Sequence, residues 1–549
     1  MRLFGKRSIV PACVISLGSW LWLDSAPAAV QVSIGQNFTS STFGVNSSGT
    51  PADPDGAVGP RHFVEFINGS FAVYNKTNGQ SVKRISDLKF WSNAGVQLAN
   101  SDGVADPRII YDSTSQRWFA SMVDFDAGAA SDPTLEANDF LLAVSATSDP
   151  TGAWHGFLFQ ADPDNGYFAD FPTLGVDSNA VYLSGDMYQG EDNPLGAALV
   201  SFPKADLLAA SPTIANRTWF GVMSYDERGQ VLQPAICLDG STSGKILATS
   251  DYGLDSSPHS NLVSFAVLNA ASPAASLTAS AFIPTASWEV PDSPYLPAPA
   301  FALIQPDGTD TLQGNDARLS ARVYAVGGVL YAIHNTQLNT HVAIRWYRVR
   351  AADNALLESG TISDPDQDLF YPSIAANAVG TVVIAFNACG GSTFITCYAV
   401  AGQTINGVTT FGSRILLQAS DVSYHDLYEE IGFSDTSRWG DYTTTAVDPS
   451  DPNRFWTIGM YASDSDVWST QITELITTPA VLLALKRSGT NMMLSWPNGV
   501  GSYQLQSATN LVTLPAWSNV AQPAVTNAGQ VSVLVPVSTA RKFFRLHKL

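Results

Sequence analysis

The sequence predicts an all-β protein, a seven-bladed β-propeller followed by a small β-sandwich-like domain at the C-terminus. Three observations lead to this prediction. A segment of strand, turn and strand recurs along most of the chain, which is typical of propeller blades. Only 14% of the residues are charged, and 42 Gly and 31 Pro supply tight turns between short strands. The last part of the chain keeps alternating apolar residues but loses the recurring segment.

The N-terminus has the pattern of a signal peptide. A basic head precedes an apolar run from Ile9 to Leu23, and small residues follow at Ala26 and Ala28. We therefore expect residues 1–28 to be removed and the mature protein to be secreted or held at the cell surface. A retained membrane anchor is the alternative, although the run is short for a bilayer-spanning helix.

The recurring segment begins with Asp, Gln, Tyr or Arg, passes through an apolar strand and a polar turn, and ends a second apolar strand on a polar residue. DPRIIYDSTSQRWFASMVDFD is one copy, and DFPTLGVDSNAVYLSGDMYQ is the next. We interpret the first strand as the innermost of a blade and DSTS as its hairpin turn. The seven copies begin at Asp55, Asp106, Asp170, Gln233, Asp316, Tyr371 and Arg438.

Third and fourth strands follow most copies, as in FLLAVSATS and WHGFLFQ after the second copy. A four-stranded sheet with two apolar faces cannot bury both faces alone, so the copies must stack around an axis. This places the propeller at residues 30–476. The last copy has three strands only, and we expect the strand-like segment VQVSIGQNF near the N-terminus to pair with it and close the ring.

From Thr478 the blade pattern stops, and residues 478–549 are predicted to form a separate all-β module. Its length of about 70 residues suits a small domain. Its partner cannot be deduced from the residues, so both attachment to the envelope and polysaccharide binding stay open.

The combination of DGAVGPRHFVEFING, DPRIIYDSTSQRWF and RWGDYTTTAVDPSDPNRFWTIGMY resembles secreted bacterial seven-bladed β-propeller proteins of the sialidase-like and WD40-like superfamily. The resemblance covers residues 53–475. The tail, with LSWP, YQLQSATNL and FFRL, is similar to a C-terminal β module of exported Verrucomicrobia proteins. DSTSQRW at Asp112 resembles the repeated turn of sialidases but lacks its Gly. The resemblance implies an architecture and no catalytic residues.

The formal net charge of -20 argues against nucleic acid as a partner, because such binding depends on Lys and Arg that displace counterions from phosphates. The acidic balance suits a solvated extracellular surface, bound divalent cations, or a neutral or cationic ligand, and selects none of these. The partner that we expect for the exported protein is an extracellular ligand, with a glycan as the first choice.

The loops that lead into the inner strands of a propeller gather around the channel mouth, which is therefore the predicted site. Guanidinium groups can hold anionic or polyhydroxyl ligands bidentately, and paired carboxylates can perform acid/base catalysis on glycosides. The candidate ligand-binding residues are Arg108, Arg318, Arg438, Asp316 and Gln233. The candidate catalytic residues are Asp106, Asp170, Asp441 and Tyr371.

The alternative for these residues is that Arg and Asp pair with each other and tie adjacent blades together. The sequence leaves three functions open. The first is a surface protein that binds a glycan at the mouth, the second is a sialidase-like glycoside hydrolase that uses the same mouth, and the third is a purely structural surface protein. A mouth filled with paired charges would favour binding or a scaffold.

Calcium is the cofactor that the acidic loops suggest, because calcium prefers oxygen ligands. The candidate ligands are Asp124, Asp126, Asp186 and Asp251, which follow or end second strands. The alternative is that these side chains fix turns by bonding to nearby amides.

Cys389 and Cys397 flank a Gly-Gly turn in CGGSTFITC, and this spacing in an exported protein predicts a disulfide between neighbouring strands. Cys237 lies in the apolar run AICLD and is expected to be a buried hydrophobe.

Overall fold

The structure is a computed structural model, and it describes residues 13–14, 30–99, 102–128, 132–190, 193–250, 258–291, 303–308, 312–426, 437–479, 481, 483–497, 502–510, 516–527, 530–538 and 541–549. The chain divides into two compact units. One is Val32–Thr477, and the other combines Met1–Gln31 with Thr478–Leu549. The predicted signal peptide lies outside the described residues except for β1 (Cys13–Val14).

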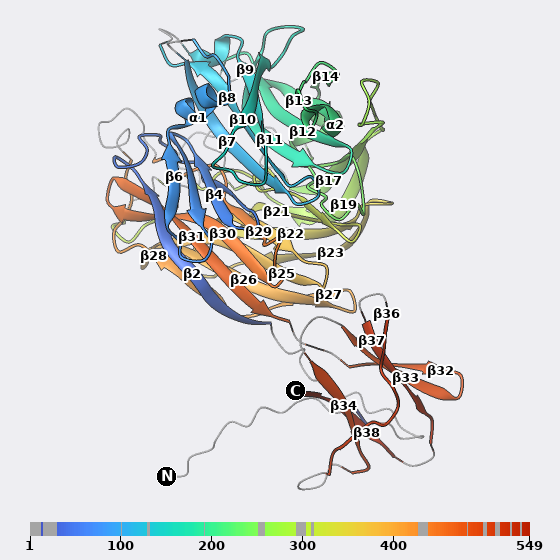
Figure 1. The fold of residues 1–549 in the computed structure, drawn as a ribbon. Coiled ribbons are helices and arrows are strands. Elements are labelled where there is room, and N and C mark those ends of the chain that lie inside the picture. The colour runs from blue at the N-terminus through green and yellow to red at the C-terminus, as the bar shows by residue number, and fades with distance from the viewer. Residues whose placement is uncertain are drawn as a thin grey trace. The chain divides into compact units, whose positions relative to one another are not determined.

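The described part of Val32–Thr477 forms seven antiparallel sheets, so the predicted seven-bladed β-propeller is confirmed (Figure 1). Blade 1 has β3 (Asp55–Val58), β4 (His62–Ile67), β5 (Ser70–Asn75) and β6 (Ser81–Ile85). Blade 2 has β7 (Asp102–Asp112), β8 (Arg117–Asp126), β9 (Asp139–Ser145) and β10 (Trp154–Gln160). Blade 3 has β11 (Phe168–Val176), β12 (Ala180–Tyr188), β13 (Pro194–Pro203) and β14 (Thr218–Met223). Blade 4 has β15 (Gln230–Pro234), β16 (Lys245–Thr249), β17 (His259–Leu268), β18 (Ser276–Leu277) and β19 (Ala281–Trp288).

Blades 5 to 7 complete the ring. Blade 5 has β20 (Tyr324–Val326), β21 (Val329–Leu338), β22 (His341–Arg350) and β23 (Ala355–Ile362). Blade 6 has β24 (Asp368–Ala376), β25 (Thr381–Gly390), β26 (Thr393–Ile405), β27 (Val408–Phe411) and β28 (Ile415–Ala419). Blade 7 has β29 (Thr444–Val447), β30 (Arg454–Asp464), β31 (Val467–Thr478) and, from the N-terminal side, β2 (Gln31–Thr42).

The hairpin turns form where their polar residues predict them. Between β7 and β8, the Asp112 carboxylate accepts hydrogen bonds from the backbone N–H (2.9 Å) and the hydroxyl (2.6 Å) of Thr114. A side chain that bonds two residues ahead fixes the turn locally. Lys204 of the next blade also pairs with Asp112 at 2.5 Å, so the same carboxylate joins two blades.

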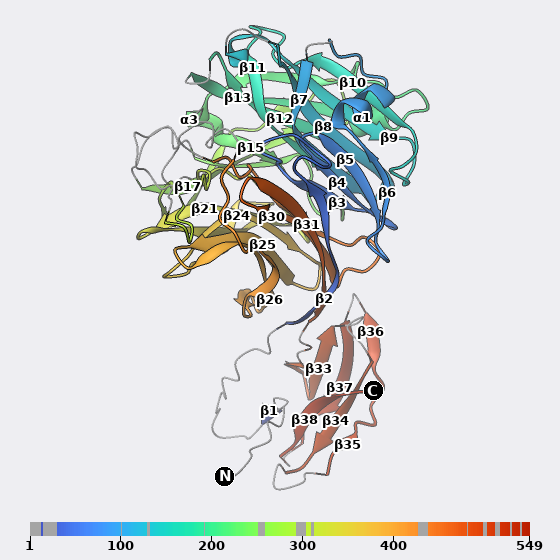
Figure 2. The same ribbon diagram turned by 90° about the vertical axis from the view of Figure 1, so that its left-hand side faces the viewer.

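The predicted closure of the ring is confirmed. Strand β2 lies beside β31 as the outer strand of blade 7 (Figure 2), although the two strands are more than 400 residues apart in the chain. Side chains reinforce the pairing, since Thr42 Oγ1 and Ser469 Oγ lie 2.8 Å apart and Glu474 accepts the backbone N–H of Gln36 at 3.0 Å. Without β2, the edge of β31 would be unpaired.

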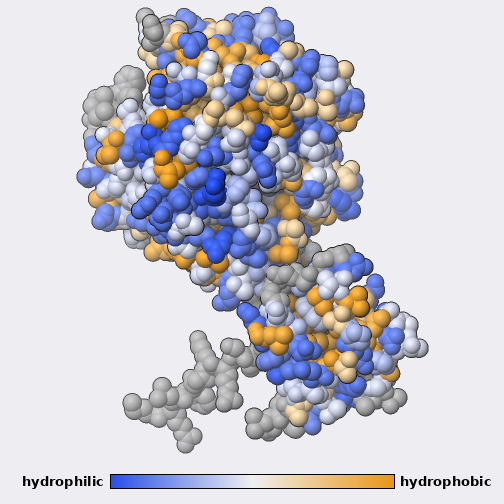
Figure 3. Space-filling model, in the orientation of Figure 1, coloured by the Kyte–Doolittle hydropathy of each residue, from blue (hydrophilic) through white to orange (hydrophobic). Residues whose placement is uncertain are grey.

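The core consists of apolar layers between adjacent blades. Trp118 and Trp91 are fully buried in the layer between blades 1 and 2, and Trp456 is buried between blades 7 and 1. Large aromatic side chains that fill such layers supply most of the burial energy of the ring. On the surface, apolar residues lie in small groups among polar ones (Figure 3).

The C-terminal unit contains two small sheets. One consists of β32 (Ala484–Ser488), β33 (Asn491–Pro497), β37 (Gln530–Pro536) and β36 (Val525–Asn527), and the other of β1, β38 (Phe543–Lys548), β34 (Tyr503–Ala508) and β35 (Ser518–Asn519). Trp496 and Val533 from the first sheet share a core with Leu505 and Phe544 from the second. This arrangement is the expected β-sandwich-like domain.

Helices are few and short in the part of the chain that the structure describes: α1 (Asp87–Asn93), α2 (Lys204–Leu207), α3 (Tyr225–Arg228) and the 3-10 helix η1 (Pro133–Leu135). Among them is no helix with the length and apolar character needed to cross a membrane.

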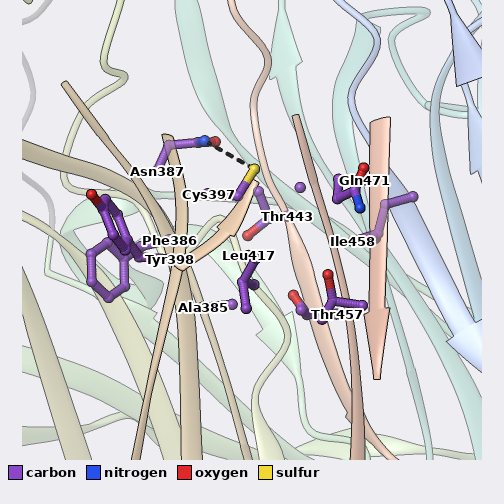
Figure 4. Close-up of a pocket in the computed structure, with 12 residues that line it drawn as sticks. Ala385, Phe386, Asn387, Cys397, Tyr398, Leu417, Thr443, Thr457, Ile458 and Gln471 are labelled. Carbon is purple, nitrogen blue, oxygen red and sulfur yellow. Dashed lines mark hydrogen bonds between the residues drawn. The ribbon is translucent and has the colours of Figure 1, made fainter. Parts of the chain in front are cut away.

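The predicted disulfide is wrong, because Cys389 and Cys397 are both free and buried. The register of β25 and β26 explains this result, since Cys397 lies opposite Asn387 and not opposite Cys389. Cys397 instead contacts the Asn387 amide at 3.5 Å beside a cavity of about 10 Å³ between blades 6 and 7 (Figure 4). Burial raises the pKa of Cys397 to about 12, so this thiol is unreactive. Cys237 is also buried, as predicted.

Candidate functional site

The inner strands of the propeller share a backbone irregularity near one end of the channel. Asp106, Phe171 and Tyr371 have positive φ values of 60°, 49° and 47°, and each precedes a proline. At all three positions the register between the first and second strand shifts. Asp53 also precedes a proline and has a φ of 48°. Non-glycine residues in this region carry strain, which is often found at functional sites.

Two of these residues, Asp53 and Asp106, lie together with a third carboxylate, that of Asp441. One oxygen each from Asp53, Asp106 and Asp441 falls within 4.8 Å of the other two, although the residues belong to different repeats. Asp53 accepts the backbone N–H of Asp441 at 2.8 Å, and Asp106 accepts that of Phe171 at 3.0 Å. Among the described residues this is the one group of His, Cys, Asp and Glu side chains with the spacing of a metal site.

Asn68, which ends the second strand of blade 1, holds this cluster in place. Its side-chain Nδ2 donates to Asp53 at 2.8 Å, and its side-chain Oδ1 accepts the backbone N–H of Asp106 at 3.0 Å. These bonds run from one blade to the next, so Asn68 positions two carboxylates of the cluster.

Burial disfavours the ionised form of these carboxyl groups. It raises the pKa of Asp53 from 3.8 to about 7, and the neighbouring Asp441 acts in the same direction. Burial and the charges of Asp170, Asp53 and Asp441 raise the pKa of Asp106 well above its usual value. The pKa of Asp170 is raised by burial and by Asp441. Burial and the proximity of like charges therefore both disfavour the ionised form of these three carboxyl groups.

Two of the three predicted arginines are paired with carboxylates of their own repeat. Arg318 binds Asp316 through Nε (2.8 Å) and Nη2 (2.7 Å), and Arg438 binds Asp441 at 3.0 Å. The Arg438 side chain is 45% exposed, which makes it the most accessible charge of the predicted set of arginines. For Arg318 and Arg438 the structure therefore shows the ion-pair alternative, although each pair lies within one repeat rather than between blades.

Arg108 is different, since it is 2% exposed and crosses the channel. Its guanidinium lies 3.4 Å from the ring centroid of Tyr442 and donates to the carbonyl oxygens of Pro172 (2.8 Å) and Ser320 (3.2 Å). One nitrogen, Nη2, has no hydrogen-bond partner among the described residues. Arg108 thus joins blades 2, 3 and 5 and contributes less to a surface site than its position in the sequence predicted.

A second buried arginine crosses from the opposite side. Arg322 of the segment before β20 pairs with Asp55 of blade 1 at 2.6 Å and also donates to the Ile109 carbonyl oxygen of blade 2. Because Arg108 and Arg322 both span the centre of the ring, they fill the channel with side chains. We call the charged residues at the mouth, Asp53, Asp106, Asp441 and Arg438, together with the two arginines that cross the ring, the hub.

The remaining predicted residues also lie near this hub. The pKa of Tyr371 is raised well above its usual value by burial and by Asp441, and its hydroxyl is 3.4 Å from the Gln313 carbonyl oxygen. Gln233 is 1% exposed and donates to the Leu319 carbonyl oxygen at 2.6 Å. Gln233 therefore holds the segment next to Arg318 and presents no free amide nitrogen to a ligand.

The predicted calcium ligands do not form a cluster among the described residues. Asp124 accepts the backbone N–H of Asp139 at 2.6 Å, and Asp126 accepts that of Gly128 at 2.8 Å, so both fix local backbone. Asp186 lies opposite Asp170 in blade 3, and burial raises its pKa to about 7. Asp251 lies outside the described residues.

Sequence reasoning missed several residues in and around the hub. Asp53 and Phe171 directly precede a proline, as Asp106 does, and this signal was present in the sequence. No local pattern distinguishes the other residues, because their roles depend on contacts across the ring. They are Asp55, Arg322 and Tyr442.

No family model and no curated protein matches the chain. Solved structures with similar folds include a protein of unknown function from Dyadobacter fermentans, which is 10% identical with a TM-score of 0.36 and covers 69% of this chain and 96% of its own. The exo-β-1,3-galactanase of Phanerochaete chrysosporium is 11% identical with a TM-score of 0.30, covering 93% and 96%. Drosophila Semaphorin 1b is 7% identical with a TM-score of 0.32, covering 81% and 88%. At these values the assignment of a propeller rests on the strand pairing itself.

Proposed function

We propose that this chain is an exported surface protein that binds an extracellular glycan at the charged hub. The observation that carries the proposal is the gathering of Asp53, Asp106 and Asp441 beside the partly exposed Arg438. Carboxylates and guanidinium groups are the side chains that bond sugar hydroxyls in pairs. Export follows from the N-terminal leader pattern and is part of the proposal.

Binding is favoured over hydrolysis by the way the charges are used. Arg318 and Arg438 are neutralised by Asp316 and Asp441, which leaves neither arginine free to hold a substrate carboxylate in the manner of a sialidase.

Glycoside hydrolysis remains the second candidate because of one observation. Burial and the neighbouring carboxyl groups raise the pKa of Asp106 well above its usual value, and a raised pKa is the property that a general acid needs. A purely structural role is the third candidate, and it predicts neither binding nor turnover.

The test is a glycan array, with hydrolysis assays run in parallel, on the full chain and on the Arg438→Ala/Asp441→Asn double variant. The matched control is Arg350→Ala, which breaks an exposed ion pair of the same i,i+3 type with Asp353. We expect array binding without hydrolysis, and at least a tenfold loss of binding in the double variant only. Equal binding by all three proteins would overturn the hub as the site, and release of sugar would favour the hydrolase.

A further inference from the structure

A second concave site lies at the loops between blades 6 and 7, outside the hub cluster. Its volume is about 410 Å³, within the range of about 300 to 1,000 Å³ typical of ligand pockets. Its wall comes from Phe394 at the start of β26, from Asp421, Val422, Ser423 and His425 after β28, from Ser465 between β30 and β31, and from Pro306 and Asp307 before β20. Segments from four parts of the chain therefore build it.

The pocket contains polar groups with unused bonding capacity. The Ser423 hydroxyl is buried and has no hydrogen-bond partner among the described residues. The Asp421 carboxylate is exposed, and no ion pair of it occurs within the described part of the chain. A buried hydroxyl without a partner is costly, and a ligand or water that bonds to it would remove this cost.

Two other polar side chains in the pocket, His425 and Asp307, bond to each other. His425 Nε2 lies 2.8 Å from Asp307 Oδ2, so each neutralises much of the charge of the other when the imidazole is protonated. This arrangement leaves Asp421 as the carboxylate available to a ligand. Phe394 and Val422 contribute apolar surface beside these groups.

We propose that this pocket binds a neutral sugar unit. A sugar presents hydroxyl pairs that can donate to the Asp421 carboxylate and bond to Ser423, and an apolar ring face that can lie on Phe394. A cationic amine can also donate to Asp421 and Ser423, but it has no ring face to lie on Phe394. The inference deepens the proposed glycan binding and rests on it, but it assigns a different site.

The experiment is saturation-transfer NMR on the full chain with the methyl glycosides of glucose, galactose, mannose and N-acetylglucosamine, and with n-butylamine as the cationic probe. The variants are Phe394→Ala and Asp421→Asn. Phe282→Ala is the matched control, because Phe282 is 52% exposed on β19 of blade 4. Thermal unfolding of each variant shows whether its fold is intact.

We expect at least one methyl glycoside to bind the wild type and Phe282→Ala, with about a tenfold weaker affinity for Phe394→Ala and Asp421→Asn. Binding of n-butylamine alone, equal binding by Phe394→Ala and Phe282→Ala, or no binding of any glycoside would each overturn the inference. The Arg438→Ala/Asp441→Asn protein separates the two proposals. Glycoside binding that survives in it but fails in Phe394→Ala supports the pocket and removes the hub as the site.

Discussion

Asp53→Asn should change how the stability of the propeller depends on pH. Asp53 is 1% exposed, and burial together with Asp441 raises its pKa from 3.8 to about 7. One pKa unit corresponds to about 1.4 kcal/mol, so ionising this carboxyl costs the folded protein about 4 kcal/mol. The folded state therefore binds more protons than the unfolded state between pH 4 and 7. The stability supplied by protonated Asp53 is complete below pH 4 and is lost as the pH rises through 7.

Asparagine suits this test because it keeps the size of the side chain and one oxygen acceptor without the charge. It also tolerates the positive φ of 48° at position 53 better than most residues. The bonds to the Asp441 N–H and the Asn68 amide cannot both be kept, since an amide has one acceptor oxygen. We expect a loss of about 1 to 2 kcal/mol at pH 4.

The assay is thermal unfolding of the full chain between pH 4 and 8, followed by circular dichroism, with a chelator present throughout. Asp53→Asn should be less stable than the wild type at pH 4 and more stable at pH 8, so the two curves should cross. The control Asp353→Asn alters a carboxylate that is 55% exposed and should run parallel to the wild type. A constant difference between Asp53→Asn and the wild type across this range would refute the reasoning.

Three further predictions concern the ring itself. Arg322→Met should lower the free energy of unfolding by about 3 to 5 kcal/mol, because it leaves the fully buried Asp55 carboxylate without its cation. In urea titrations, adding Asp55→Asn should restore part of this loss. If the losses of the two single variants simply add in the double variant, the pairing is contradicted. Removal of residues 30–42 should lower the unfolding temperature and promote association through the exposed β31 edge. Light scattering can measure this association. A monomer with an unchanged unfolding temperature would contradict ring closure by β2. The thiols of Cys237, Cys389 and Cys397 are free and buried. A thiol reagent should therefore label them only after unfolding, and a reductant should leave the unfolding midpoint unchanged. A lower midpoint in the presence of reductant would indicate a disulfide.

The repeat was sufficient to predict the blades and the closure strand, because both follow from local properties. Alternating apolar residues identify strands, and polar turns such as the one at Asp112 mark hairpins. A sheet with two apolar faces then has few ways to bury them, and the short final copy shows where another strand is needed. These conclusions do not require the position of any single side chain.

The site was predicted only in part, because its details depend on register and on contacts across the ring. The sequence placed Asp106, Asp441 and Arg438 near one mouth, and the structure brings them together. Sequence spacing could not show that Cys397 lies opposite Asn387, since a turn with one more residue would change the partner. Arg322 and Asp55 lie more than 260 residues apart in the chain, and no local pattern connects them.

The composition of the hub bears on the choice between a scaffold and a binding protein. A hub that served stability alone would be more stable with apolar residues, because buried ion pairs seldom repay the loss of hydration. Arg322 and Asp55 conform to a structural role, since each is satisfied by several partners. Asp53 and Asp106 do not, because burial and neighbouring carboxyl groups raise the pKa of both, and both residues lie on backbone with positive φ. Strain and an unfavourable ionised form at the same two residues favour a ligand at the hub over a purely structural role.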